Sequence, residues 1–236
     1  MKKVNTIKNF EVVEFFGDHL VSTKVLKKFP VVINAGVHNG EEIGDLYSLV
    51  PELKMYAIEP SNKCFSPIKE KYKYNNIEWF NSALISESRR TEKERQTGTY
   101  PKLDFVDWHV GNGSTRFGYG GIQELQAHNV SNLSTYSVSG ITVSKILEIM
   151  KESTVGLFKA DIEGAEYEVM MDWNKKLSDT IRQISIEYGN IQGRSHQDVR
   201  YDIVERLESL GYYVTVHRIR KDGGSLYAIR GDDCIS

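Results

Sequence analysis

The 236-residue sequence contains few cysteines and no long apolar run. Cys64 and Cys234 lie far apart and form no metal-binding spacing, so free thiols in a reducing compartment are the simplest interpretation. No stretch approaches the roughly 18 apolar residues that a membrane-spanning helix needs. The basic start of the chain also lacks the uninterrupted apolar segment of a secretory signal. We therefore expect a cytoplasmic protein without a membrane span.

An excess of positive charge is missing as well. Lys and Arg number 30 against 32 Asp and Glu, which gives a net charge of −2. Nucleic-acid binders usually carry a basic excess, so we expect no nucleic-acid partner. The basic cluster of Arg89, Arg90, Lys93 and Arg95 is offset by Glu87, Glu92 and Glu94, which is typical of a solvated face. Length and a hydrophobic content of 40% predict one globular domain over 1–236.

Short apolar runs alternate with segments of helical periodicity. This alternation predicts an α/β fold, with a doubly wound and mostly parallel sheet that ends in an antiparallel hairpin. The predicted strands are 31–33, 54–58, 77–84, 156–162, 181–187, 212–219 and 225–230, and the predicted helices are 41–49, 62–72, 143–150, 165–171 and 197–210.

Two segments fall outside this alternation. Residues 1–29 read as an N-terminal extension with a short helix over 21–29. Residues 86–139 are polar and glycine-rich, with a hairpin predicted near 103–108 and a strand over 133–138. Since long irregular segments in compact domains are usually functional, we interpret 86–139 as an insertion that recognises the substrate.

Residues 31–60 have the pattern strand, glycine turn, helix, strand. The turn holds Gly36 and Gly40 as G-x-x-x-G, not the G-x-G-x-x-G that cradles a pyrophosphate. Glu59 ends the second strand, where a carboxylate can accept hydrogen bonds from both hydroxyls of a ribose. A ribose without a pyrophosphate favours S-adenosyl-L-methionine (SAM) over NAD. The alternative is a glycine-containing turn that binds no nucleotide.

Further acids follow two later strands. Asp161, Glu163 and Glu166 follow one strand, and Glu187 ends the next. Because ligands bind at the carboxyl ends of strands in open α/β sheets, we expect Asp161 and Glu187 to lie side by side there. They could hold Mg²⁺ or Mn²⁺ through oxygen ligands or supply a general base. The alternatives are helix capping by Asp161 or Glu163, a solvated Glu166, and a salt bridge from Glu187 to Arg194 or Arg200.

Two histidines lie near the same predicted face. His38 sits inside the glycine turn and would point at the cofactor's methionine end or at the substrate, and His196 follows the strand that ends in Glu187. Either could act as a base, and either could be an ordinary surface histidine.

Several of these residues occur in the order seen in FkbM-type methyltransferases, and the chain resembles that family over about residues 20–215. The resemblance implies a Rossmann-like class I fold and SAM-dependent O-methylation, largely of sugars and natural-product hydroxyls. It is carried by Gly36 and Gly40, Tyr56-Ala57-Ile58-Glu59-Pro60, Asn81-Ser82-Ala83-Leu84, the block from Lys159 to Glu166 (KADIEGAE), and Glu187.

Carried over position by position, the resemblance implies four groups of site residues. Asn34, Gly36 and Gly40 would line the methionine part of SAM, Glu59 with Pro60 would hold the ribose, Ser82 and Ala83 would lie at the adenine, and Asp161, Glu163 and Glu187 would face the methyl-transfer site. The chain departs from the family pattern at Asn34, where Asp is usual, at the turn residues Val37-His38-Asn39, and at Val143-Ser144.

We therefore expect a SAM-dependent methyltransferase that O-methylates a hydroxyl of a sugar or surface-polysaccharide precursor. Its acceptor would be a small molecule or a sugar nucleotide, and a homo-oligomer is left open. A non-catalytic α/β scaffold is one alternative. An NAD-dependent oxidoreductase is another, which the missing G-x-G-x-x-G and the missing Tyr-x-x-x-Lys pair disfavour.

Overall fold

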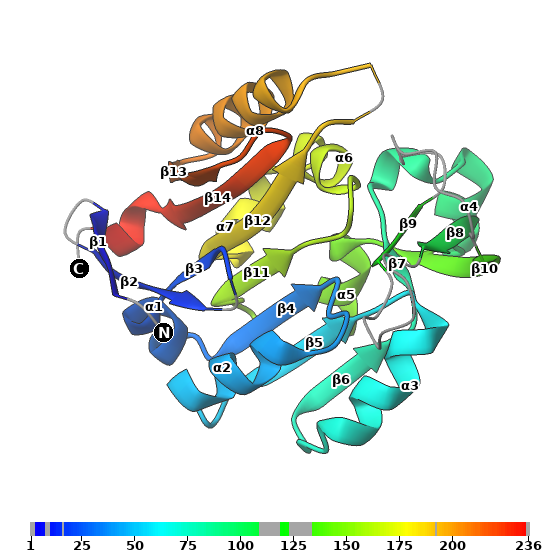
Figure 1. The fold of residues 1–236 in the computed structure, drawn as a ribbon, viewed down its shortest axis with the longest axis horizontal. Helices are drawn as coiled ribbons and strands as arrows, with labels where there is room; N and C mark the ends of the chain where they lie inside the picture. Colours follow the sequence, from blue (N-terminus) through cyan, green and yellow to red (C-terminus); the bar gives the residue numbers. More distant parts are fainter. Residues whose placement is uncertain are drawn as a thin grey trace.

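A seven-stranded sheet forms the centre of the molecule (Figure 1). The computed structural model describes residues 3–7, 10–15, 17–108, 119–122, 134–191 and 193–234. Five neighbouring strands of the sheet are parallel, and the last two along the chain form an antiparallel hairpin at one edge, which confirms the predicted fold. In spatial order the strands are β13 (Tyr212–Ile219), β14 (Gly223–Arg230), β12 (Gln183–Gly189), β11 (Leu157–Ala160), β4 (Val31–Ala35), β5 (Lys54–Ile58) and β6 (Ile77–Phe80).

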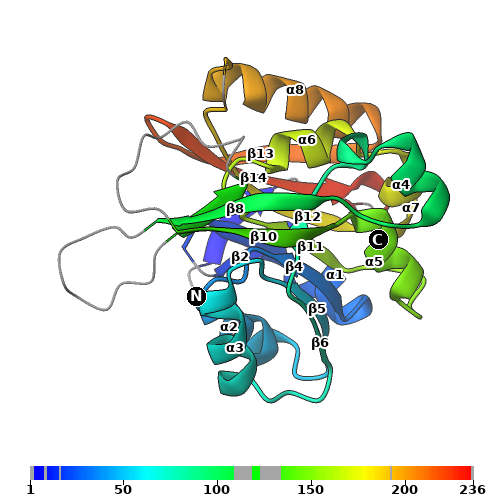
Figure 2. The same ribbon diagram turned by 90° about the vertical axis from the view of Figure 1, so that its right-hand side faces the viewer.

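Both faces of this sheet are buried, as the unbroken apolar run of β4 predicts. Val31 and Ile33 pack into one core and Val32 into the other, because successive side chains of a strand point to opposite faces. Figure 2 shows helices on the two sides of the sheet. The first core is completed by α5 (Val143–Ile149), α6 (Glu166–Met171), α7 (Lys175–Thr180) and α8 (His196–Ser209), and the second by α1 (Thr23–Lys28), α2 (Glu41–Leu49) and α3 (Asn62–Lys71). No helix among the described residues is long and apolar enough to cross a membrane.

The N-terminal extension contains a three-stranded antiparallel sheet that the sequence pattern did not predict. Its strands are β1 (Lys3–Ile7), β2 (Phe10–Phe15) and β3 (His19–Ser22). Val12 and Leu20 pack against Tyr227 and Ile229 of β14. The extension therefore covers the face of the main sheet near its antiparallel edge.

The insertion forms a second sheet in the order β7 (Ala83–Leu84), β10 (Ser134–Ile141), β8 (Lys102–Trp108) and β9 (Tyr119–Ile122). The single strand predicted over 77–84 is wrong, since Ile77–Phe80 joins the main sheet and Ala83–Leu84 the second. The Asn81 amide between them donates to the carbonyl oxygens of Glu59 (3.0 Å) and Pro60 (3.3 Å), which turns the chain. In Figure 1 the second sheet lies on the side toward which the arrows of β4 and β11 point.

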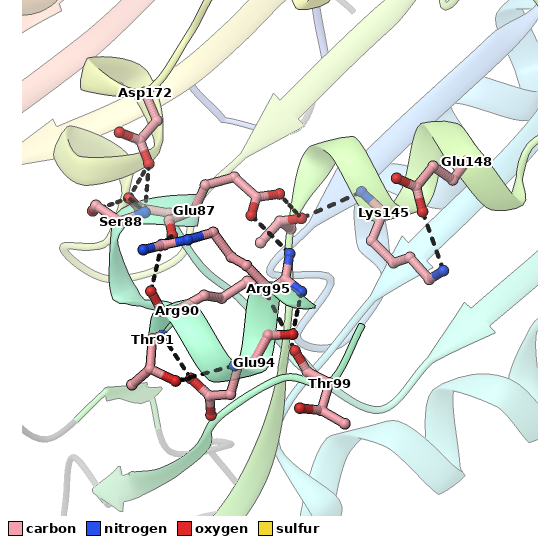
Figure 3. A network of polar contacts seen from close by, with 12 residues as sticks. Glu87, Ser88, Arg90, Thr91, Glu94, Arg95, Thr99, Lys145, Glu148 and Asp172 are labelled. Atoms are coloured by element: carbon pink, nitrogen blue, oxygen red, sulfur yellow. Dashed lines mark hydrogen bonds and ion pairs between the residues drawn. The ribbon is translucent and has the colours of Figure 1, made fainter. Parts of the chain in front are cut away.

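The charged segment of the insertion docks on the main domain through polar contacts (Figure 3). Arg90 pairs with Glu87 at 3.0 Å, Glu87 in turn accepts from the Thr142 hydroxyl, and the Ser88 N–H donates to Asp172 at 2.9 Å. Glu92, Lys93 and Arg95 are exposed, as predicted for a solvated face, but the side chain of Arg90 is only 10% exposed, so the prediction is wrong for Arg90. The segment includes the turn η1 (Glu87–Arg89) and α4 (Glu92–Thr97), and Arg89 also pairs with Glu168 of α6.

Two glycines outside the site provide a test of the packing. Gly44 lies inside α2 with open space around its missing Cβ, so Gly44→Ala should stabilise the protein by about 0.5–1 kcal/mol. At Gly156 a Cβ would lie 2.0 Å from the Phe29 carbonyl oxygen, so Gly156→Ala should destabilise it by more than about 1 kcal/mol. Urea unfolding measures both changes, and a stabilising Gly156→Ala would contradict this packing.

Candidate active site

The glycine turn after β4 is held against the backbone that follows β11. Gly36 has a φ of +73°, and a Cβ on it would lie 1.7 Å from the carbonyl oxygen of Asp161. At Gly40, with the same φ, a Cβ would lie 2.6 Å from the Tyr72 ring. Both positions therefore require glycine, because a Cβ at either one would clash with a neighbouring part of the protein. The result is a turn that lies directly beside the strand-end acid Asp161.

Glu59 is held rigidly under this turn. It is only 4% exposed, and its carboxylate accepts the backbone N–H of His38 and that of Ser61, each at 2.7 Å. These bonds use two of the about four acceptor positions of a carboxylate. The acid thus lies at the end of β5 in a fixed orientation, next to the turn that carries His38.

Asp161 and Glu187 lie side by side, as the sequence predicted. Their strands are parallel neighbours with Ala160 opposite Ile186, so the two carboxyl groups stand at the same edge of the sheet. Burial, with the charge of Asp161 second, raises the pKa of Glu187 to about 8. Burial, and then the charges of Asp161 and Glu166, raise the pKa of Glu163 to about 8. A cluster of acids with pKa values near neutrality therefore stands at the carboxyl ends of β11 and β12.

Glu166 is part of this cluster and is not solvated. Its carboxylate accepts the backbone N–H groups of Ile162 and Gly164, which shapes the loop between β11 and α6. Burial and the charge of Asp161 raise its pKa to about 7. The helix-capping alternative is also wrong, because the N-cap of α6 is Ala165 with no side-chain bond.

The ion-pair partner of Glu187 is Arg220, which follows β13. The two arginines predicted as alternative partners of Glu187 have other contacts. Arg194 pairs with Asp202, and Arg200 stacks on the Tyr201 ring at 4.9 Å. Arg220 also contacts Asp18, in the turn between β2 and β3. The N-terminal sheet is thereby connected to the acid cluster through one guanidinium group.

The two candidate histidines lie in different surroundings. His38 is in the glycine turn, with a φ of +50° and its N–H on Glu59. His196 begins α8, and its backbone N–H (2.8 Å) and Nδ1 (3.2 Å) both contact the Asn190 side chain. The structure thus places His38 at the predicted cofactor turn and gives His196 a local bond at a helix start.

The remaining predicted cofactor residues surround Glu59 and the turn. Pro60 is buried directly after Glu59, and Ser82 and Ala83 follow the Asn81 that binds the Glu59 carbonyl. Asn34 is fully buried and donates to Glu42 at 3.1 Å. Its side chain therefore lies beneath the turn.

Lys159 and Glu42 are residues of this region that sequence reasoning missed. Both are fully buried, with 3.6 Å between Lys159 Nζ and Glu42 Oε1. The signal was a lysine inside the apolar strand 157–160, which is unusual for a core position.

A metal role for Asp161 and Glu187 stays a prediction. Across the described ranges, no group of three or more His, Cys, Asp or Glu side chains is arranged to hold a metal ion.

A doubly wound sheet with an antiparallel terminal hairpin, a glycine turn and strand-end acids defines the class I methyltransferase architecture. The model of the FkbM methyltransferase domain matches residues 34–214, and the chain belongs to this family. A search of curated protein sequences finds no significant match.

Three solved structures with a similar chain path are distant in sequence. A precorrin-6y methyltransferase from Geobacter metallireducens is 11% identical, with a TM-score of 0.46 and coverage of 86% of this chain and 81% of that one. Fibrillarin from Aeropyrum pernix with natively bound SAM is 11% identical, with a TM-score of 0.45 and coverage of 87% and 68%. A SAM-dependent methyltransferase from Aquifex aeolicus is 14% identical, with a TM-score of 0.40 and coverage of 87% of each chain.

The residues present fit the cofactor of this family. Glu59 is an oriented acceptor at a strand end, which suits ribose hydroxyls. The sulfonium of SAM is a cation, and Asp161, Glu163 and Glu187 form a half-buried group of acids whose mutual repulsion a cation would relieve.

The acid cluster predicts how stability depends on pH. The folded-state pKa values of Glu163, Glu166 and Glu187 are raised above the unfolded values, so the native state holds more protons between about pH 5 and 8. Their stabilisation is fully present below about pH 4.5 and is lost as pH rises through about 7–8. Glu163→Gln should reduce the slope of the unfolding free energy against pH in this range by at most about 1.4 kcal/mol per pH unit.

The measurement is urea unfolding of the ligand-free protein at several pH values. Glu205→Gln, the same change on the exposed face of α8, is the control and should leave the slope as in the wild type. A Glu163→Gln slope equal to that of the wild type would show that Glu163 ionises normally.

Proposed function

We propose that the chain is a SAM-dependent O-methyltransferase whose acceptor is a hydroxyl of a sugar or of a surface-polysaccharide precursor. The observation that carries the proposal is the pair Asp161 and Glu187, which stand side by side where adjacent parallel strands end, with the pKa of Glu187 raised to about 8 by burial and by the charge of Asp161. The pair lies beside the Gly36 turn, to which Glu59 also bonds.

The cofactor is assigned to the carboxyl ends of β4 and β5. Glu59 would accept from the ribose hydroxyls, and the turn from Gly36 to Gly40 would take the methionine end. Ser82 and Ala83 would border the adenine. His38 would reach from the turn toward the acceptor. These roles follow from where each residue lies and from the family resemblance.

Asp161 and Glu187 are assigned to the methyl-transfer step. When bound, SAM supplies a methyl group on a positively charged sulfur. A sugar hydroxyl is a weak acid and needs a base as it reacts. A general base works best with a pKa near the working pH, and burial brings Glu187 to about 8. Glu187 would accept the hydroxyl proton, and the negative charge of Asp161 beside it would help keep its pKa high. His196, bonded to Asn190, is a weaker candidate for the base.

The acceptor is assigned to the space next to the second sheet. This sheet stands at the edge of the main sheet where β4 and β11 end (Figure 1). The Tyr136 hydroxyl of β10 accepts the N–H of Asn62, which starts α3 just after Glu59 and Pro60. Phe105 and Tyr136 lie with ring centroids 5.7 Å apart. Phe105 is buried and supports the half-buried Tyr136 ring, whose hydroxyl beside the start of α3 suits a sugar. We propose a small-molecule or sugar-nucleotide acceptor in the cytoplasm.

Binding separates this proposal from a scaffold and from an NAD enzyme. SAM and S-adenosylhomocysteine at 100 times Kd should each stabilise the wild type by about 2.7 kcal/mol, which is a Tm increase of roughly 5–10 °C for a protein of this size. NAD should give no increase. Glu59→Gln should lose most of the increase, because an amide nitrogen cannot accept from a hydroxyl.

Each variant's shift is read against its own ligand-free Tm, and Glu78→Gln on the exposed side of β6 is the matched control. Stabilisation by none of the three ligands would favour a scaffold. Stabilisation by NAD alone would favour the oxidoreductase.

Catalysis tests the acid pair. With an acceptor found in a panel of nucleotide-activated sugars, Asp161→Asn and Glu187→Gln should each lower kcat by about 100- to 10,000-fold, the usual contribution of general base catalysis. Their affinity for S-adenosylhomocysteine should stay close to the wild type. The measurement is S-adenosylhomocysteine release, and Asp179→Asn on the exposed end of α7 is the control.

A chelator distinguishes the two roles of the pair. Activity that EDTA removes and Mg²⁺ or Mn²⁺ restores would assign Asp161 and Glu187 to a metal, whereas a direct base predicts full activity in EDTA. Full activity of both variants would refute either role.

A further inference from the structure

A buried ion pair lies directly beneath the glycine turn. Lys159 of β11 and Glu42 of α2 are both 0% exposed, with 3.6 Å between Nζ and Oε1. Lys159 stands opposite Asn34 in the parallel pairing of β11 and β4, so both side chains leave the sheet on the same face. Asn34 donates to the same Glu42 oxygen at 3.1 Å. One carboxylate therefore joins β4, α2 and β11.

The ammonium group of Lys159 also holds the backbone where the turn begins. Nζ donates to the Gly36 carbonyl oxygen at 2.9 Å and to the Ala35 carbonyl oxygen at 3.4 Å. Ala35 is the last residue of β4, and Gly36 is the first residue of the turn, with a φ of +73°. Two successive carbonyl groups are thus fixed by a single buried cation at the change from strand to turn.

Stability alone is a poor explanation for this arrangement. Buried ion pairs seldom stabilise a protein more than apolar side chains of similar size, because both charges lose their hydration. This pair is also incompletely satisfied, since Glu42 Oε2 and Asn34 Oδ1 have no hydrogen-bond partner within the described structure. Burial raises the pKa of Glu42, which is a sign of the same cost.

We propose that Lys159 is a positioning residue for the cofactor, with Glu42 as its counter-ion: its ammonium group fixes the Ala35 and Gly36 carbonyls and so sets the shape of the turn. The inference rests on the proposed SAM binding at this turn. Lys159 is fully buried under the backbone that it holds and acts through that backbone. A turn already held in its bound shape loses less entropy when a ligand binds, which raises affinity.

A double variant separates positioning from stability. Lys159→Met leaves Glu42 buried without its cation, so both Tm and SAM affinity should fall. Lys159→Met combined with Glu42→Met replaces the ion pair by apolar side chains, and Tm should rise well above that of Lys159→Met, although Asn34 loses its acceptor. SAM and S-adenosylhomocysteine should still bind at least about tenfold more weakly, because the turn carbonyls have lost their donor. Calorimetry gives the affinities.

Glu42→Gln is the matched single variant. It removes the same ion pair, yet it keeps an oxygen for Asn34 and leaves both carbonyl bonds of Lys159 in place. Its SAM affinity should stay within a few-fold of the wild type. Lys159→Gln breaks the ion pair from the other side and shortens the donor, so it should weaken binding more than Glu42→Gln. If the double variant does not fold, the SAM affinities of Glu42→Gln and Lys159→Gln still test the proposal. Equal losses of affinity in these two variants would overturn it.

Hydrogen exchange provides a readout that needs no cofactor. The Gly36 N–H donates to the Ile58 carbonyl and the Gly40 N–H to the Val37 carbonyl, so both report on the turn. In the double variant these amides should exchange at least about tenfold faster, with the helix amides of α8 unchanged as the internal control.

Besides equal losses in the two single variants, the inference is overturned by wild-type SAM affinity in the double variant, by affinity that recovers in proportion to Tm, or by unchanged exchange at Gly36 and Gly40. A wild type that binds no SAM would refute the proposed function instead, and the exchange rates would still decide whether Lys159 holds the turn.

Discussion

The site depends on one close contact between Gly36 and the backbone of Asp161. A Cβ at Gly36 would lie 1.7 Å from the Asp161 carbonyl oxygen, so no other residue permits this approach. The contact brings the turn after β4 to the acid after β11, and through the pairing of β11 with β12 it also brings the turn near Glu187. The glycine turn and the strand-end acids are therefore adjacent because two backbones meet without a side chain between them.

This arrangement gathers negative charge where the sheet ends. Burial, and then the charges of neighbouring acids, raise the pKa values of Glu163, Glu166 and Glu187 to about 7–8. A stable fold does not require such a cluster, and a cationic ligand would benefit from it. A similar electrostatic cost arises below the turn, where the charged side chains of Lys159 and Glu42 are buried together. Two costly electrostatic features on either side of one turn are better explained by ligand binding than by folding.

Sequence reasoning predicted the parts that depend on local pattern and strand order. The seven-stranded sheet and the adjacency of Asp161 and Glu187 follow from the alternation of strands and helices, since parallel neighbours end at the same edge. The break between Ile77–Phe80 and Ala83–Leu84 could not be predicted, because it depends on the Asn81 amide reaching back to Glu59. The burial of Glu166 was missed for a similar reason, as its partners are backbone N–H groups of the loop that it shapes.

The partner of Glu187 shows how far the site extends beyond the segment that defines the family. The FkbM domain model covers residues 34–214, whereas Arg220 follows it and Asp18 precedes it. Arg220 contacts both Glu187 and Asp18, so the charge beside the proposed base is balanced by a guanidinium group that the N-terminal sheet holds in turn. Half-exposed ion pairs contribute little to stability, and this one joins three segments that are far apart in the sequence. Its consequence is therefore electrostatic: the extension and the terminal hairpin together hold a guanidinium group beside the Glu187 carboxyl.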